Sequence, residues 1–191
     1  HTKFIWCKKM SSLRLINQTS ISTPVNTIQI TDVFTTDYDI YCVEVVGTTC
    51  SSQRENNSMD MRLIDNTGSE ISSNDYANEA RFFRGFSDAS FDLGSASRDD
   101  FFILYHDTSA QDGVGNMKMW IWSPSDSSNY TFHNAEASGR MSYSTTNKRP
   151  YFTKGVGVLK QTNTITGYSF TNRDSFNIAT GTFRTYGLRR N

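Results

Sequence analysis

The sequence predicts an all-β fold, an antiparallel β-sandwich with little or no helix, and three observations support this. Apolar and polar residues alternate with a period of two in one segment after another. Glycine, proline, asparagine, aspartate and serine cluster between these segments, as they do in turns. No window carries the i, i+3, i+4, i+7 apolar spacing of an amphipathic helix over a sufficient length, and residues 76–81 come nearest to it.

The alternation predicts twelve strands in a single domain. They are expected near residues 11–18, 27–34, 39–47, 58–65, 80–86, 100–106, 116–123, 130–136, 139–146, 151–160, 164–171 and 181–188. A chain of 191 residues fits one domain. At that size roughly 70% of the unfolded chain's surface is buried on folding, so the fold needs neither a disulfide nor a metal ion.

The chain start is unusual because no methionine precedes Met10. We expect residues 1–12 to be an N-terminal arm or a non-native leader, and residues 13–191 to form one jelly-roll domain. An ordered arm would need a surface that buries its apolar side chains, and we expect a neighbouring subunit to supply it. The expected contact residues are Phe4, Ile5 and Trp6.

The predicted strand at 58–65 has one face for the core and one for water. Met59, Met61 and Leu63 alternate with Asp60 and Arg62. Because successive side chains of a strand point to opposite faces, the two charged residues are expected to face solvent.

The predicted strand at 116–123 is apolar on both faces. One face carries Met117, Met119 and Ile121, and the other carries Lys118, Trp120 and Trp122. If the methionine face enters the core, the two tryptophans lie outside, where exposed indoles mark a contact with a subunit or a ligand. Burial of the strand on both faces is the alternative.

Residues 178–187, IATGTFRTYG, predict that the chain closes on a strand. Gly181 would let the chain turn into it. Phe183 and Thr185 would take one face of this strand, and Arg184 and Tyr186 the other. The segment is therefore interpreted as structural.

Charge and cysteine content limit the function classes. The 19 basic and 19 acidic residues balance, so the chain has no electrostatic signature of nucleic-acid or membrane binding. Three cysteines are an odd number, which favours free thiols over a disulfide framework. We expect no cofactor.

The sequence lacks the common catalytic and metal-binding motifs, and this favours a protein that is not an enzyme. No HExxH, GxSxG, CxxC, EF-hand or P-loop motif is present, and the three histidines are far apart in sequence. Asp37 and Asp39 flank a turn, and Asp99 and Asp100 would point to opposite faces of a strand. Residues 106–115 could be a calcium loop but are more typical of a hairpin turn. We predict no catalytic and no metal-binding residues.

Several segments together resemble a known family. Residues 13–47 have a strand, a Ser/Thr turn, an alternating strand and a Tyr-x-x-Tyr step at Tyr38 and Tyr41; MDMRLID follows at 59–65, and MKMWIWSPSDSSNYT at 117–131. The ending at 165–188 is ITGYSFTNRDSFNIATGTFRTYGL. In this order they resemble the small β-jelly-roll virion proteins of tailed bacteriophages, marine ones in particular, which end in a G-T-x-R-x-Y-G strand.

The resemblance implies a non-enzymatic structural protein displayed on the virion surface, as a capsid decoration protein or a short fibre or appendage subunit. It implies a homotrimer that contacts other capsid or tail proteins. The alternative is a receptor-recognition domain that binds a host surface glycan. That alternative would use three exposed aromatic residues as stacking platforms, Trp120, Trp122 and Tyr130.

Overall fold

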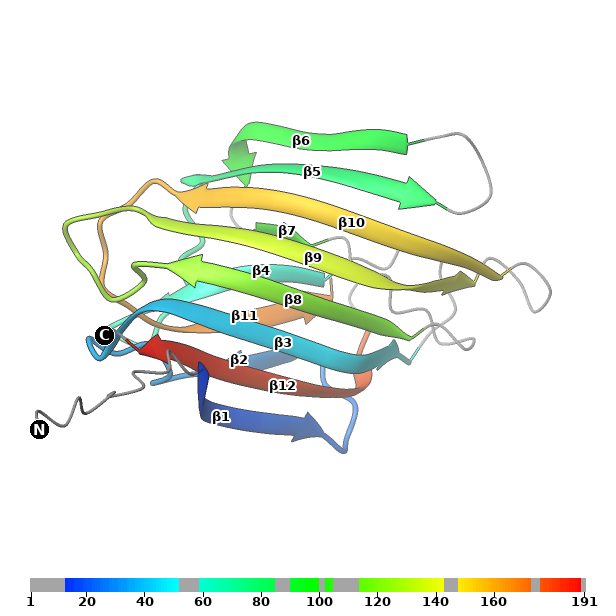
Figure 1. The fold of residues 1–191 in the computed structure, drawn as a ribbon, viewed down its shortest axis with the longest axis horizontal. Coiled ribbons are helices and arrows are strands. Elements are labelled where there is room, and N and C mark those ends of the chain that lie inside the picture. Colours follow the sequence, from blue (N-terminus) through cyan, green and yellow to red (C-terminus); the bar gives the residue numbers. More distant parts are fainter. Residues whose placement is uncertain are drawn as a thin grey trace, which may run out of the picture.

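The computed structural model is a sandwich of two antiparallel sheets (Figure 1). It describes residues 13–51, 59–84, 90–99, 102–104, 114–142, 148–172 and 176–189. These residues form strands and loops, and none of them is helical. The predicted all-β sandwich is therefore confirmed. In the same ranges there is no helix that could cross a membrane.

The large sheet has eight strands and the small sheet four. The large sheet contains, in spatial order, β1 (Leu13–Ile21), β12 (Ile178–Arg189), β3 (Tyr38–Cys50), β8 (Gly115–Trp122), β9 (Thr131–Ser142), β10 (Lys148–Leu159), β5 (Tyr76–Arg84) and β6 (Ser90–Asp99). The small sheet contains β2 (Thr27–Ile30), β11 (Ile165–Asn172), β4 (Met59–Asp65) and β7 (Phe102–Leu104).

The topology is a jelly roll extended by two hairpins. When β5, β6, β9 and β10 are set aside, eight strands remain, with orders β1-β12-β3-β8 and β2-β11-β4-β7. Each sheet thus alternates strands from the two ends of the chain, as in the paired Greek keys of a jelly roll. The hairpins β5–β6 and β9–β10 continue the first sheet beyond β8, which widens it to eight strands (Figure 1).

The core lies between the sheets and is rich in large side chains. Tyr168 and Phe170 of β11 are fully buried, and so is Phe183 of β12 on the opposite sheet. The ring centroids of Phe170 and Phe183 are 5.6 Å apart, within the range of a favourable aromatic pair. The two sheets therefore interlock through their aromatic side chains.

The strand from 131 to 142 differs from the sequence prediction of two strands, at 130–136 and 139–146. The gap between the two predicted strands, at residues 137–138, lies inside β9, and so does Gly139. A Cβ atom there would come within 2.4 Å of the Val114 carbonyl oxygen and 2.8 Å of the Tyr151 ring. Gly139 is thus required for a close approach within the strand and marks no turn.

Two further segments are strands that the sequence patterns described poorly. Residues 90–99 form β6, where no strand was predicted. Residues 76–81, the nearest approach to a helical pattern, lie in β5, with Tyr76 and Ala80 buried.

The predicted core faces are mostly correct. Met59, Met61 and Leu63 of β4 are fully buried, and Arg62 is partly exposed beside Glu70. The prediction that Asp60 faces solvent is wrong, because Asp60 is only 7% exposed. The neighbouring strand β7 pairs with β4 along this stretch and helps to enclose it.

The final strand β12 has the two faces expected of it. Phe183 and Thr185 are buried, whereas Arg184 and Tyr186 lie on the outer side. Gly181 has a φ of +152°, a backbone angle that L-residues with a side chain rarely adopt. The strand lies between β1 and β3, so both of its edges are hydrogen-bonded.

Candidate functional site: the outer face of the large sheet

The face of the large sheet that points away from the core, here called the outer face, carries an unusual amount of exposed apolar surface. The large apolar side chains exposed on it are Leu13, Leu15, Val46, Phe83, Phe132, Phe152 and Val156. Two more exposed apolar residues, Val114 and Tyr130, lie in the adjoining loops. Large apolar side chains exposed together on one face are typical of interaction surfaces.

Strand register aligns apolar side chains across seven strands. Trp122 of β8 lies opposite Ile40 of β3 on one side and opposite Phe132 of β9 on the other. The apolar row consists of Leu13, Leu188, Ile40, Trp122, Phe132, Val158 and Ala77, in spatial order. At about 4.8 Å between strands, this row is roughly 29 Å long.

A second row runs beside the first, two residues further along each strand. It consists of Leu15, Tyr186, Cys42, Trp120, Asn134, Val156 and Glu79. Cys42 is fully buried although it points away from the core, since Tyr186 and Trp120 flank it across the strands. Burial raises the pKa of its thiol to about 11. The second row is thus largely apolar from β1 to β8, and it carries the polar residues Asn134 and Glu79 between β9 and β5.

A charged row follows, two residues further on along each strand and three on β1, where the register shifts between Leu15 and Asn17. It consists of Gln18, Arg184, Glu44, Lys118, Glu136, Lys154 and Arg81. From Arg184 to Lys154 the charge alternates in sign. Lys154 Nζ lies 2.9 Å from Glu136 Oε1, and Lys118 Nζ lies 4.0 Å from Glu44 Oε1. These pairs are solvent-exposed, so they contribute little stability.

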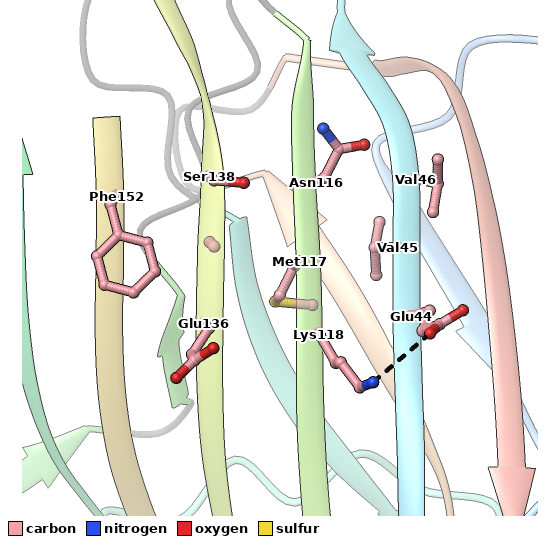
Figure 2. A pocket seen from close by; sticks show the side chains of 10 residues that line it. Glu44, Val45, Val46, Asn116, Met117, Lys118, Glu136, Ser138 and Phe152 are labelled. Atoms are coloured by element: carbon pink, nitrogen blue, oxygen red, sulfur yellow. Dashed lines mark ion pairs between the residues drawn. The ribbon is translucent and has the colours of Figure 1, made fainter. Parts of the chain in front are cut away.

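Figure 2 shows three members of the charged row, Glu44, Lys118 and Glu136, together with the apolar side chains beyond them. Here Phe152 of β10 and Val46 of β3 border a shallow groove of about 340 Å³, with Glu44, Lys118 and Glu136 at its charged end. The outer face is therefore apolar at both ends of the strands, with a band of alternating charge between.

A second hollow lies against the apolar row. It has a volume of about 550 Å³, and its lining includes Trp122, Phe132, Asn134, Glu79 and Val156. Two aromatic side chains and two polar ones thus share a concave surface on β5, β8, β9 and β10.

The structure places Trp120 and Trp122 on the outer face, each partly buried, while Met119 and Ile121 of the same strand enter the core. This confirms the arrangement in which the methionine face packs inside. The ammonium group of Lys118 lies over the Trp120 ring, 5.4 Å from its centroid. Tyr130 lies in the β8–β9 loop and is 45% exposed.

Phe132 was not singled out from the sequence, although it is 50% exposed and lies directly opposite Trp122. The period-two alternation of the predicted strand at 130–136 places Phe132 on its solvent face, and this pattern could have identified it. The expected arm contacts Phe4, Ile5 and Trp6 lie outside the described residues, as does Asp100.

Few groups suited to catalysis gather in the part of the chain that the structure describes. Within it, no cluster of three His, Cys, Asp or Glu residues could hold a metal ion. Asp37 is exposed in a turn, where its backbone N–H donates to Thr35 Oγ1. His133 is buried on the inner side of β9, and desolvation lowers its pKa to about 3, so it is neutral near pH 7.

Comparison with known proteins gave no family assignment. No family model and no curated protein matches the chain. Among solved structures, the CBM2 module of the evolved Dit protein of Lactobacillus casei BL23 phage J-1 is similar at 10% identity and a TM-score of 0.27, over 93% of this chain and 77% of that one. Infectious bursal disease virus strain Gx is similar at 10% identity and a TM-score of 0.17, over 94% of this chain and 41% of the viral chain.

Proposed function

We propose that this protein is a non-enzymatic structural subunit of a phage virion, displayed on the particle surface as a capsid decoration protein or a short fibre or appendage subunit. In this proposal the outer face of the large sheet binds another protein subunit. The observation that carries the assembly role is the apolar row, which crosses seven strands and includes the half-exposed Phe132. Burial of such a surface drives protein association.

The composition of the face favours a protein as its occupant. The apolar row contains leucine, isoleucine, valine and alanine side chains as well as two aromatic rings. Aliphatic side chains pack against apolar protein surface, whereas a sugar ring needs a flat aromatic platform with polar groups around it. The face is also roughly 29 Å long, which suits a subunit interface better than one sugar ring.

The assembly role is tested with paired variants on the two outer surfaces of the sandwich. Phe132→Ser combined with Val156→Ser should remove association through the outer face, giving a smaller species in sedimentation velocity, and should reduce incorporation into particles. Gln29→Ser, on the exposed side of the small sheet, is the matched control and should change neither. Normal assembly of the Phe132/Val156 variant would contradict the proposal. Separately, a density map of the particle would show whether the subunit lies on the head or on the tail.

The resemblance noted in the sequence also leads us to propose a homotrimer. Three chains of 21.6 kDa give a particle of about 65 kDa. A closed trimer uses two different surfaces of each subunit, because a heterologous contact joins unlike patches. Native mass spectrometry at micromolar concentration tests the trimer, and a persistent single-chain mass would contradict it.

Glycan binding is the second candidate function, and the hollow beside Trp122 and Phe132 favours it. There Asn134 and Glu79 could accept and donate hydrogen bonds to hydroxyl groups next to an aromatic platform. Trp122 is a better platform than Trp120, whose ring faces the Lys118 ammonium group. Host polysaccharide should raise the melting temperature of the wild type but not of Trp122→Ala. An equal shift for both proteins would contradict a site at Trp122.

A further inference from the structure

Four adjacent members of the charged row alternate in charge. In spatial order they are Glu44, Lys118, Glu136 and Lys154. Reversing this order turns every negative position into a positive one and every positive position into a negative one. A surface with this property is complementary to a copy of itself rotated by a half-turn.

The same half-turn also matches the apolar residues. A two-fold axis that runs along the strands, between β8 and β9, would keep each row opposite the equivalent row of the second copy. Trp122 would then face Phe132 of the second copy, and Ile40 would face its Val158. In the second row, Tyr186 would meet Glu79 of the second copy, which can accept a hydrogen bond from the phenol.

We infer that the outer face binds a second copy of this chain in a face-to-face pair, with the two-fold axis along the strands between β8 and β9. This inference rests on the proposed assembly role and specifies the partner and its orientation. The central ionic contacts are Lys118 to Glu136 of the second copy and Glu44 to Lys154 of the second copy. Each contact occurs twice because the interface is isologous.

The size of the face fits such a pair. Seven strands span roughly 29 Å, and the rows from the apolar row to the groove residues span roughly 20 Å, so the face covers roughly 600 Å². Stable interfaces bury about 600 to 1,000 Å² per partner, so the face reaches the lower end of that range.

Sheets packed face to face cross at about 30°, so facing residues of the two copies stay opposite each other best near the two-fold axis. The contacts nearest this axis are those of Lys118 with Glu136 and of Trp122 with Phe132. The half-turn also sets Arg184 opposite Arg81 of the second copy, but these residues lie at the two margins of the face, where solvent screens them.

Charge-reversal variants mixed with one another provide the sharpest test. Lys118→Glu alone places glutamates opposite glutamates in the pair, and Glu136→Lys alone places lysines opposite lysines. Each should weaken self-association about tenfold or more. In an equimolar mixture the two variants should form a mixed pair, since each glutamate at 118 then meets a lysine at 136 of the other chain.

The mixing step separates contacts between chains from contacts within one chain. Lys118 and Glu136 are also neighbours on β8 and β9 of the same sheet, so a double variant could recover through an internal contact. Recovery on mixing two single variants can only arise between chains. Asn66→Glu and Asn66→Lys, in an exposed turn after β4, are matched charge controls and should leave the association of each chain unchanged.

Native mass spectrometry of the wild type and of the mixture gives the outcomes. Two results together would support the inference. The wild type should have a mass of about 43 kDa, or about 130 kDa if the pairs also form trimers through other surfaces, and the mixture should contain mixed pairs of the two variants. A trimer of about 65 kDa alone, or two variants that stay apart on mixing, would overturn the two-fold pair. If the two-fold pair is overturned but the Phe132→Ser, Val156→Ser variant still fails to enter particles, the proposed assembly function stands without the pair.

Discussion

The Tyr168 hydroxyl of β11 lies 2.8 Å from the Thr185 hydroxyl of β12, so a hydrogen bond joins the two sheets through the core. Both residues are fully buried. Burial raises the pKa of the phenol, so Tyr168 stays neutral across the physiological range. Two polar atoms thus satisfy each other in a region that is otherwise apolar.

Removing both of these hydroxyls should cost less than the sum of the two single removals. Tyr168→Phe leaves the Thr185 hydroxyl buried without this partner, and we expect a loss of about 1–2 kcal/mol in the free energy of unfolding. Thr185→Val should cost a similar amount. The double variant should be clearly less destabilised than the two single effects together. Urea unfolding of the four proteins checks this, and simple additivity would show that the hydroxyls do not interact.

Gly187 lies against the ring of Tyr38, and this contact requires a glycine. A Cβ atom at position 187 would lie 2.5–2.6 Å from three carbon atoms of the ring. Gly187→Ala should therefore destabilise the protein by about 1–3 kcal/mol through overpacking. The penalty should shrink in a Tyr38→Leu background, where the ring is absent. Equal penalties in both backgrounds, measured by thermal unfolding, would place the cause elsewhere.

The period-two pattern predicted much of this fold because it reports which side of a strand enters the core. Met119 and Trp120 were assigned to opposite faces from their positions alone, and the structure agrees. Strand ends were harder, as Gly139 illustrates. A glycine inside a strand and a glycine in a turn look alike until the residue that approaches it, here Tyr151, is known.

The candidate site could be predicted only in part. The sequence placed Trp122 outside, but the apolar row depends on the register of β8 against β9, which sets Trp122 opposite Phe132. Register is a property of strand pairs distant in the chain, and no local pattern encodes it. The alternating charges of Glu44 and Lys118 likewise became a row only when the sheet was assembled.

The buried imidazole of His133 should make stability depend on pH. Its folded-state pKa of about 3 lies below the usual unfolded value of about 6.5, so the unfolded chain binds the proton more readily. Stability is therefore fully present above pH 6.5 and is lost as the pH falls toward 3. Between pH 6.5 and 5 this group should cost about 2 kcal/mol.

Denaturant unfolding between pH 5 and 7.5 measures this effect. His133→Asn removes the titrating group, so its stability should vary less with pH over this window than that of the wild type, whatever the variant's absolute stability. A variant with the same pH slope as the wild type would show that other groups cause the dependence.

Cys42 should be an unreactive thiol that two flanking side chains, Tyr186 and Trp120, protect. Its pKa of about 11 reduces the thiolate fraction at pH 8 about a hundredfold compared with a thiol of pKa about 9, and the side chain is fully buried as well. In a background with Cys7 and Cys50 replaced by alanine, Cys42 should react with a maleimide at least about a hundredfold more slowly in the folded than in the unfolded protein.

Trp120→Ala should accelerate the reaction, because Trp120 flanks Cys42 directly. Trp122→Ala, which lies opposite Ile40, is the matched control and should leave the rate nearly unchanged. Equal acceleration by both variants would indicate general loosening of the sheet.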